Sequence, residues 1–263
     1  MRALLEPRIC AVSYLNTVPL VWGFAHGSQR GRYQLSFAIP SECADRLRDG
    51  RADIGIVPVV ECERQNLRII PGAGIASDGP VRSILLVSKV PFDRIGSLAA
   101  DSSSRTSVQL ARVILARRFG VDPHLVPANP DLEAMLRECD AALIIGDPAL
   151  AVDPAALPWR VLDLGAEWTS MTRLPMVFAV WAARQDLDPA SYSAADFVAS
   201  LEEGEKHLDE IVAAESRARH MSEALVREYL TRNVSFRIGP RESAAVDLFL
   251  RYVAELELRE APV

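Results

Sequence analysis

The stretch RICAVSYLNTVPLVWGFAHG, residues 8–27, contains the pattern that decides the fold. Its first part, RICAVSY, has the apolar content of a strand. The segment PLVWGFAHG is typical of a helix, with Pro19 near its start and Gly27 just past its end. The hydrogen-bonding side chains of SYLNT lie where the strand ends. In open α/β sheets ligands bind beyond the carboxyl ends of strands, so this placement favours a ligand-binding role.

The same alternation of short apolar runs and amphipathic stretches continues to about residue 180 and predicts β-α units around largely parallel sheets. Expected strands are YQLSFAIP, ADIGIVPV, LRIIPGAGIAS and VRSILLVSK, followed later by DAALII, WRVLDLG and LPMVFAVWAA. Between the first two, Ser41 is expected to cap a helix that buries Cys43, Ala44 and Leu47. From about residue 189 the pattern is purely helical, with a last helix opening near Pro240.

The domain organisation follows from a shift in composition. Near residues 88–97 the chain becomes rich in Pro, Asp and Gly, and we expect it to cross there into a second lobe. The first lobe then comprises 1–88 and 180–263, including the C-terminal helices, and the second comprises 89–179. A small ligand is expected in a cleft between the two lobes.

Composition excludes several classes of protein. With 263 residues, 49% of them hydrophobic, the chain has a core to bury, and its net charge of −6 without a basic stripe argues against nucleic-acid binding. Its four cysteines show no C-x-x-C spacing, which favours reduced thiols over a disulfide framework or a zinc site. The N-terminus lacks a secretory apolar stretch, and no apolar run has the length of a membrane span. We therefore expect a cytoplasmic protein with no membrane partner.

The segment DSSSRTS, residues 101–107, is the most informative local signal. It precedes an expected helix whose apolar face carries Val108, Ala111, Leu115 and Phe119 and which ends at Gly120. Hydroxyl groups at a helix N-terminus can join the unpaired N–H groups there, an arrangement suited to a carboxylate or a phosphate. The alternative is a Ser-rich turn that only caps the helix.

Other candidate residues carry weaker signals. In GDPAL, Gly146 permits close backbone approach and Asp147 is an acceptor, although a turn with a helix cap explains both. Ser83 stands at the start of an expected strand. The four histidines form no metal or nucleophile pattern, and His124 is expected on the surface within a connection. The sequence contains no G-x-S-x-G, P-loop or G-x-G-x-x-G motif, so it offers no motif that would indicate a hydrolase, a kinase or a dehydrogenase.

Taken together, SYLNTVPL, ADIGIVPV, SILLVS, DSSSRTSVQL, GDPAL, DLGAEW and LPMVFAVWA occur in an order and spacing that resemble the chorismate dehydratases of the futalosine route to menaquinone. The resemblance extends over essentially the whole chain and includes YLTRNVSFRIG near its end. It implies a two-lobed α/β fold like that of type 2 periplasmic binding proteins, with the ligand cleft between the lobes. It also implies that the dianion chorismate loses water to give 3-[(1-carboxyvinyl)oxy]benzoate, without cofactor or metal.

On this basis Asn16 and Ser83 are the candidate catalytic residues. Both are expected at strand ends of the first lobe, where they would hydrogen-bond the substrate near its reacting carbons or its leaving hydroxyl. Ser103, Thr106 and Ser107 are expected to hold a carboxylate. The full set of candidate substrate-binding residues is Tyr14, Thr17, Ser103, Arg105, Thr106, Ser107, Gly146 and Asp147. Helix capping by Ser13 and Thr17, with Tyr14 as a wall of the cleft, is the alternative for the first motif.

The chain departs from the family's pattern just before the last expected strand. The family has Thr-Gly-Leu-Pro-Phe there, whereas this chain has Arg173 in place of Gly and Met176 in place of Phe. The backbone angle and the packing are therefore open to change. Arg173 is either a surface residue or an added carboxylate contact.

Two rival functions stay open. A non-catalytic binding protein of the same fold would ordinarily carry a secretion signal or a helix-turn-helix, and neither is evident. The related later-pathway enzyme that makes 1,4-dihydroxy-6-naphthoate from cyclic dehypoxanthine futalosine is expected to have a different first motif and a catalytic histidine in the second lobe.

Overall fold

The computed structural model describes residues 6–260, apart from the side chains of residues 259 and 260. The chain divides into two compact units: unit 1 comprises Met1–Ala76 and Val177–Gly239, and unit 2 comprises Ser77–Met176 and Pro240–Val263. The expectation about a secretory leader concerns residues 1–5 in part, and these lie outside the described residues.

The boundaries of these units correct the predicted lobes, 1–88 with 180–263 and 89–179. The strand at Ile84–Ser88 pairs with two strands of unit 2, so the chain leaves unit 1 near residue 77 and not near residue 88. The last helix also belongs to unit 2, whereas the sequence pattern assigned it to the first lobe. Composition marks loops, but strand pairing decides which sheet a strand joins.

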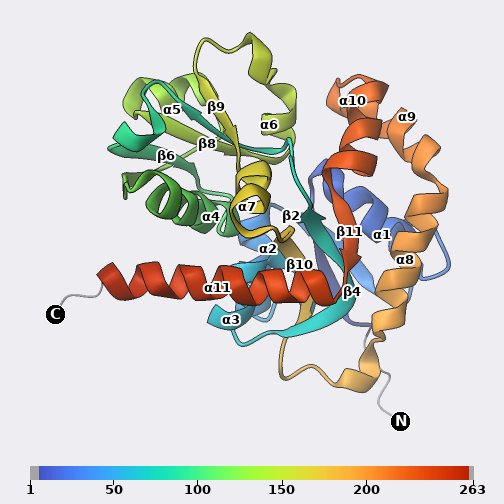
Figure 1. Ribbon diagram of the computed structural model, residues 1–263. Coiled ribbons are helices and arrows are strands. Elements are labelled where there is room, and N and C mark those ends of the chain that lie inside the picture. The colour runs from blue at the N-terminus through green and yellow to red at the C-terminus, as the bar shows by residue number, and fades with distance from the viewer. Residues whose placement is uncertain (1–5, 261–263) are drawn as a thin grey trace. The chain divides into compact units, whose positions relative to one another are not determined.

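Unit 1 is built on a mixed sheet with the strand order β11-β4-β10-β3-β1-β2 (Figure 1). β1 runs parallel to both β2 and β3, while β10 is antiparallel to β3 and β11 is antiparallel to β4. The strands are β1 (Arg8–Val12), β2 (Gln34–Ala38), β3 (Ile54–Pro58), β4 (Arg68–Ser77), β10 (Met176–Ala183) and β11 (Ser235–Ile238). All five residues of β3 are buried, as its apolar sequence indicates.

The helical segments of unit 1 are η1 (Leu15–Thr17), α1 (Val18–Ala25), α2 (Pro40–Arg48), α3 (Val59–Arg64), η5 (Pro189–Ser191), α8 (Ala194–Lys206), α9 (Leu208–Arg219), α10 (Glu223–Glu228) and η6 (Tyr229–Asn233). α1 and α8 pack closely. Gly204 of α8 permits this approach, since a Cβ at this position would stand 2.2 Å from the carbonyl oxygen of Pro19 in α1. Phe24 of α1, Phe197 of α8 and Trp181 of β10 form a buried aromatic cluster with ring centroids 5.1–6.1 Å apart. This packing fixes α1, which directly follows the SYLNT motif.

Unit 2 contains a second mixed sheet with the strand order β7-β6-β8-β5-β9. β6 is parallel to β7 and β8, and β5 is antiparallel to β8 and β9. The strands are β5 (Ile84–Ser88), β6 (Ser97–Asp101), β7 (His124–Ala128), β8 (Ala141–Ile145) and β9 (Arg160–Asp163). The carboxyl ends of β6 and β8 and the start of β5 therefore lie along one edge of this sheet.

The helical segments of unit 2 are η2 (Phe92–Arg94), α4 (Thr106–Ile114), η3 (Leu115–Phe119), α5 (Leu132–Glu138), α6 (Gly146–Ala151), η4 (Pro154–Ala156), α7 (Leu164–Thr172) and α11 (Pro240–Glu260). Met135 and Leu136 of α5 pack with Val87 and Ile144 in a buried cluster. α11 packs against α4 (Figure 1). Its Phe249 meets Trp168 of α7 edge to face, with ring centroids 5.7 Å apart. The C-terminal helix thus completes the core of unit 2.

Several local expectations need correction. Ser41 is not the cap of α2, since the helix begins at Pro40 and Ile39 is the capping residue. Cys43, Ala44 and Leu47 are buried as expected. Within the segment expected to be purely helical, Ser235–Ile238 forms strand β11. His124 is exposed as expected, but it begins strand β7.

In the second unit the expected turn at GDPAL is the short helix α6. Ala111 of α4 and Leu115 of η3 are buried as expected, but Val108 of α4 and Phe119 of η3 are only half-buried. Gly120 ends this helical stretch in the left-handed conformation, with φ of 72°. Leu110, Val113 and Ile114 are also buried, and the helical spacing had not identified these three residues.

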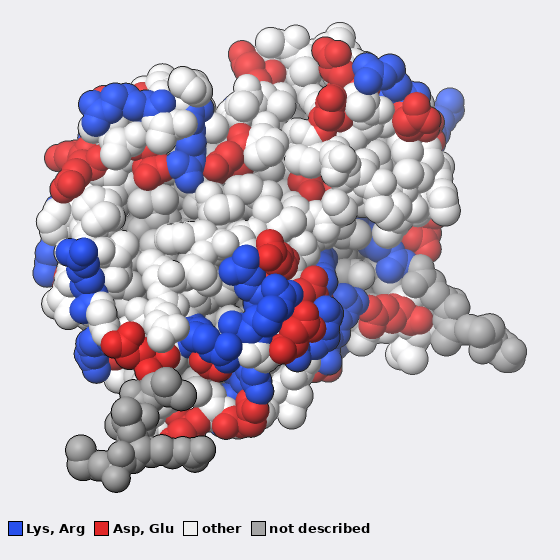
Figure 2. Space-filling model, turned by 180° about the vertical axis from the view of Figure 1, so that it is seen from behind, with Lys and Arg blue, Asp and Glu red and all other residues white. Residues whose placement is uncertain are grey.

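Charged side chains of opposite sign lie next to one another on the face shown in Figure 2. Ion pairs such as Arg48–Asp45 and Arg51–Asp49 join neighbours of this kind on the surface. None of the helices described within residues 6–260 is long and apolar enough to cross a membrane.

Candidate functional site

The first group of candidate residues lies at the carboxyl end of β1 in unit 1. Ser13 donates its backbone N–H to the carbonyl of Ala38 at 3.0 Å, which extends the β1–β2 pairing by one residue. The chain then forms the short turn η1, in which the N–H of Thr17 donates to the carbonyl of Tyr14 at 3.0 Å. This turn holds Tyr14, Asn16 and Thr17 together between β1 and α1.

Asn16 is held by a residue that sequence reasoning missed. Its Nδ2 donates to the hydroxyl of Tyr229 at 3.0 Å, and the Tyr229 side chain is almost fully buried. The Oδ1 atom of Asn16 is buried and accepts no hydrogen bond from any residue within 6–260. Because an unsatisfied buried acceptor is costly, a partly buried amide held on one side with its oxygen open is arranged to receive a donor from a ligand.

Capping does not explain this motif. Thr17 precedes α1 but makes no side-chain capping bond, and its fully buried Oγ1 has no partner within the described residues. Tyr14 is half-buried and lines a hollow of about 280 Å³ together with Trp22, Phe37 and Arg219. The expectation of Tyr14 as a wall therefore fits this hollow of unit 1.

Arg219 of α9 anchors the same turn. Its Nη2 donates to the carbonyl oxygen of Ser13 at 3.2 Å, and its Nη1 forms an ion pair with Glu215 one helical turn earlier. The aromatic walls of the hollow form a surface suited to a ring, while Glu215, which also lines the hollow, already pairs with this guanidinium. No local sequence motif marks Arg219 for this position.

The second group lies along one edge of the sheet in unit 2. Ile84 of β5 is opposite Ile145 of β8, so Ser83 and Gly146 extend the two strands side by side. The N–H of Gly146 donates to the carbonyl of Ser83 at 2.8 Å, and Gly146 has a φ of 64°. Ser83 is buried, whereas Asp147 is half-buried in the first turn of α6.

Arg82 fixes the backbone at Ser83. It has a φ of 65°, a conformation that side chains other than glycine adopt at a cost of about 1 kcal/mol or more. Its backbone N–H donates to Asp163 at 2.7 Å, and its guanidinium donates to the carbonyls of Ala149, Leu150 and Val152 at the end of α6. Arg82 therefore ties β5, β9 and α6 together beside Ser83.

The DSSSRTS loop lies at the same edge, between β6 and α4. Ser103, Thr106 and Ser107 are buried, and Arg105 is half-buried. The N–H of Ser103 already donates to Asp101 Oδ1 at 2.9 Å, and that of Ser107 donates to Ser104 Oγ at 3.2 Å. A ligand would thus depend on side-chain hydroxyls here, and Thr106 Oγ1 is buried with no partner within residues 6–260.

Asp101, at the start of this loop, is a further residue that sequence reasoning missed. It is fully buried, and its Oδ2 atom has no partner among the described residues. Burial raises the pKa of its carboxyl group, although the side-chain and backbone hydrogen bonds from Ser103 act in the opposite direction. Its position as the last residue of the buried strand β6 was a signal that could have placed it with the serines.

The structure thus brings the candidates together as two groups, one in each unit. Tyr14, Asn16 and Thr17 form the group of unit 1. The group of unit 2 contains Ser83, Ser103, Arg105, Thr106, Ser107, Gly146 and Asp147. Within residues 6–260 no three His, Cys, Asp or Glu side chains gather as metal ligands.

The departure at residue 173 is accommodated by the backbone. Arg173 is exposed and ends α7 in the left-handed conformation, with φ of 62°, so the angle suited to the family's glycine is kept. Its carbonyl accepts a hydrogen bond from Arg241 at 3.1 Å. Met176 is fully buried at the start of β10. The description of Arg173 as a surface residue is confirmed.

The fold identifies the structural class of the protein. It is an α/β protein like the type 2 periplasmic binding proteins, since the alkanesulphonate-binding protein of Escherichia coli superposes with a TM-score of 0.64 at 17% identity, covering 96% of this chain and 87% of its own. A protein from Archaeoglobus fulgidus superposes over 98% of this chain and 100% of its own with a TM-score of 0.76, also at 17% identity. At these identities the likeness concerns the fold alone.

The chain belongs to the menaquinone biosynthesis family, whose model matches residues 7–255. It is 29% identical to the chorismate dehydratase of Thermus thermophilus over 234 residues, which cover 82% of this chain and 84% of that protein. It is 27% identical to the chorismate dehydratase of Campylobacter jejuni over 175 residues, 65% of this chain and 61% of that protein. The resemblance drawn from the motifs is confirmed at the level of the family.

Proposed function

We propose that this protein is a chorismate dehydratase, a carbon–oxygen lyase that removes water from chorismate to give 3-[(1-carboxyvinyl)oxy]benzoate in menaquinone biosynthesis. The family match and the names of its relatives support this proposal. The observation that carries it is the environment of the Asn16 amide. Its Nδ2 donates a hydrogen bond to the Tyr229 hydroxyl, and its buried Oδ1 has no partner within residues 6–260. It offers an oriented acceptor at the end of β1, where a ligand of this fold class binds.

The chemistry asks for positioning more than for strong acid or base groups. The hydrogen on the ether-bearing ring carbon is acidified through the diene by the ring carboxylate. When it leaves as a proton and the neighbouring hydroxyl leaves with the C–O bonding electrons, one water forms and the ring becomes aromatic. The protein contributes by orienting the substrate, stabilising charge on the ring carboxylate and excluding water.

In this proposal Asn16 and Ser83 contact the substrate near the reacting carbons or the leaving hydroxyl. The buried hydroxyls of Ser103, Thr106 and Ser107 bind a carboxylate, and Tyr14, Thr17, Arg105, Gly146 and Asp147 complete the binding surfaces. Burial raises the pKa of the Asp101 carboxyl group at the start of the same loop. The proposed location is the cytoplasm.

An assay with two substrates tests the proposal. The purified protein is mixed separately with chorismate and with cyclic dehypoxanthine futalosine, and the products are separated and weighed by mass spectrometry. We expect a product lighter than chorismate by one water and no conversion of the second compound. Conversion of cyclic dehypoxanthine futalosine alone would assign the later-pathway lyase activity, and conversion of neither would favour a binding protein.

A further inference from the structure

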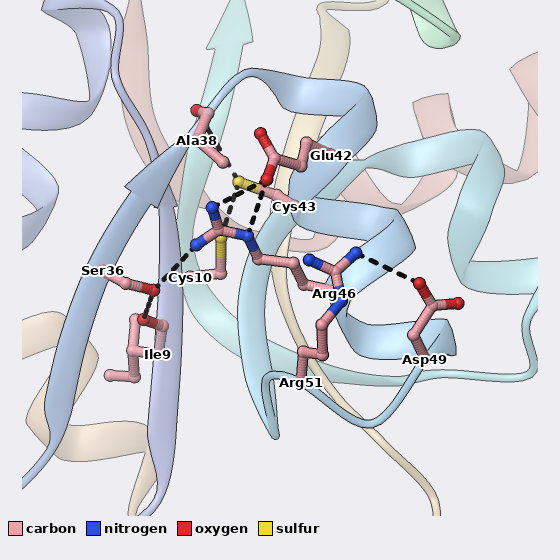
Figure 3. Close-up of polar contacts among 9 residues, drawn as sticks. All are labelled: Ile9, Cys10, Ser36, Ala38, Glu42, Cys43, Arg46, Asp49 and Arg51. Atoms are coloured by element: carbon pink, nitrogen blue, oxygen red, sulfur yellow. Dashed lines mark hydrogen bonds and ion pairs between the residues drawn. The ribbon is translucent and has the colours of Figure 1, made fainter.

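Two of the four cysteines, Cys10 of β1 and Cys43 of α2, lie in direct contact within unit 1. Their Sγ atoms are 3.2 Å apart, and both residues are fully buried (Figure 3). A disulfide requires sulfurs about 2.05 Å apart, so an approach of roughly 1 Å between a strand and the helix packed on it would suffice. Cys62 and Cys139, the other two cysteines, are also buried.

The surroundings of the pair favour a thiolate on Cys10. Arg46, one turn after Cys43 on α2, lies beside both sulfurs, while its guanidinium pairs with Glu42 at 2.7 Å and donates to Ser36 Oγ at 3.4 Å (Figure 3). Ser36 is the register partner of Cys10 in the neighbouring strand β2. The hydrogen bond between Cys10 and Cys43, then the charge of Arg46 and the hydroxyl of Ser36, lower the pKa of Cys10 to about 7 against the effects of burial and of Glu42.

Cys43 has the opposite character. Its hydrogen bond to Cys10 and its burial raise the pKa of its thiol, so Cys43 holds the proton that the pair shares. Burial raises the pKa of Cys62 to about 12, and Cys62 serves as the unreactive comparison. The pair therefore combines an ionised thiol with a protonated thiol in contact with it, which is the arrangement of an attacking and a resolving cysteine.

The pair lies near the edge of the sheet. β2 is the last strand of its sheet, and the Arg46 side chain beside the thiols is 24% exposed. Since both thiols are fully buried, even a molecule of the size of hydrogen peroxide requires a movement of this side chain to reach them. Larger oxidants would require α2 to move.

We propose that Cys10 and Cys43 form a redox-active dithiol, which a small hydroperoxide converts into an intramolecular disulfide. The Cys10 thiolate attacks one peroxide oxygen, the O–O bond breaks, and the departing hydroxide takes the proton that Cys10 released, giving water and a sulfenic acid. The Cys43 sulfur then attacks the sulfur of Cys10, and its proton leaves with the hydroxyl group as a second water. Two thiols and one hydrogen peroxide give one disulfide and two waters.

Peptide mapping of the wild-type protein tests this proposal independently of any enzymatic activity. The reduced protein is treated with a few equivalents of hydrogen peroxide, alkylated under denaturing conditions and digested with trypsin without reduction. Cleavage after Arg8, Arg30, Arg32 and Arg46 places the two cysteines in separate peptides, 9–30 and 33–46. We expect these peptides to be linked, with a mass two hydrogens below their sum, and Cys62 and Cys139 to be alkylated.

Single variants test the asymmetry of the pair. With Cys43→Ser, Cys10 should accumulate as a sulfenic acid and react with dimedone at least tenfold more than Cys43 does in Cys10→Ser. The matched control Cys62→Ser should give the wild-type yield of linked peptide. Absence of the linked peptide in the wild-type protein, or oxidation of Cys62 at the rate of Cys10, would overturn the proposal.

Discussion

Asn16 and Tyr229 are 213 positions apart in the sequence, yet the amide nitrogen of Asn16 donates to the hydroxyl of Tyr229 at 3.0 Å. This bond fixes the amide so that Oδ1, which has no partner within the described residues, keeps one orientation. The segment η6, far along the chain, thereby positions the candidate catalytic residue that follows β1. Tyr229 is a positioning residue in this account.

Tyr229→Phe tests the role of this hydroxyl. We expect kcat for chorismate to fall by about tenfold, because losing one hydrogen bond that orients the amide is worth about 1.4 kcal/mol in the transition state. KM should change less, since Asn16 itself is still present. Tyr192→Phe is the matched control, as its hydroxyl contacts Arg68 and not the candidate site. Equal steady-state kinetics in the two variants would remove Tyr229 from the mechanism.

Ser83 can be compared with a second buried serine of the same strand region. We expect Ser83→Ala to reduce kcat by about 100-fold or more, the loss typical of removing a group that stabilises the transition state. Ser88 is fully buried and its hydroxyl donates to the carbonyl of Val90 at 2.8 Å. Ser88→Ala should cost about 1 kcal/mol of stability and leave kcat unchanged. A similar kcat in both variants would contradict the catalytic assignment of Ser83.

Arg173→Gly should stabilise the protein. Arg173 is exposed with a φ of 62°, and a left-handed residue at the end of a helix is strained unless it is glycine. We expect the free energy of unfolding, measured by urea denaturation, to rise by about 0.5–1 kcal/mol. Arg173→Ala, which keeps the strain, is the control and should not give this gain. A loss of stability in the glycine variant would show that the Arg173 side chain makes a favourable contact.

Asp101 should make stability depend on pH. Because its folded-state pKa is raised, the folded protein binds more protons than the unfolded chain at mildly acidic pH, and stability falls as pH rises through that pKa. In Asp101→Asn this loss is absent, so the stability of the variant relative to the wild type should increase as the pH rises above about 4, the ordinary pKa of an aspartate. Thermal unfolding of both proteins across this range measures the difference. A constant difference would mean that the carboxyl group titrates normally.

The sequence predicted most of the strands, because β1, β3 and β8 are apolar runs between turn residues. It also predicted the family, since several motifs occur together in order. It could not predict the boundary between the units, because the pairing of β5 with β8 and β9 is a non-local choice that composition does not reveal. The family's pattern expects glycine at residue 173, and the left-handed angle survives there with arginine.

The grouping of the candidate residues could not be predicted in this way. The sequence placed Ser83 with Asn16 in the first lobe, whereas Ser83 precedes β5 in unit 2, where its carbonyl accepts a hydrogen bond from the N–H of Gly146. Tyr229 and Arg219 could not be found this way, because their distance in sequence from Asn16 and Ser13 gives no local signal. Asp101 was overlooked because the serines after it suggested an anion site, in which a carboxyl group is unexpected.

The most direct test of the central claim is the conversion of chorismate by the wild-type protein, Asn16→Ala and Ser83→Ala under one set of conditions, followed by absorbance and confirmed by product mass. We predict that the wild type forms a benzoate lighter than chorismate by one water and that each variant is at least about 100-fold slower while unfolding at a similar temperature. Chorismate left unchanged by the wild type, beyond its slow spontaneous decay, would contradict the account.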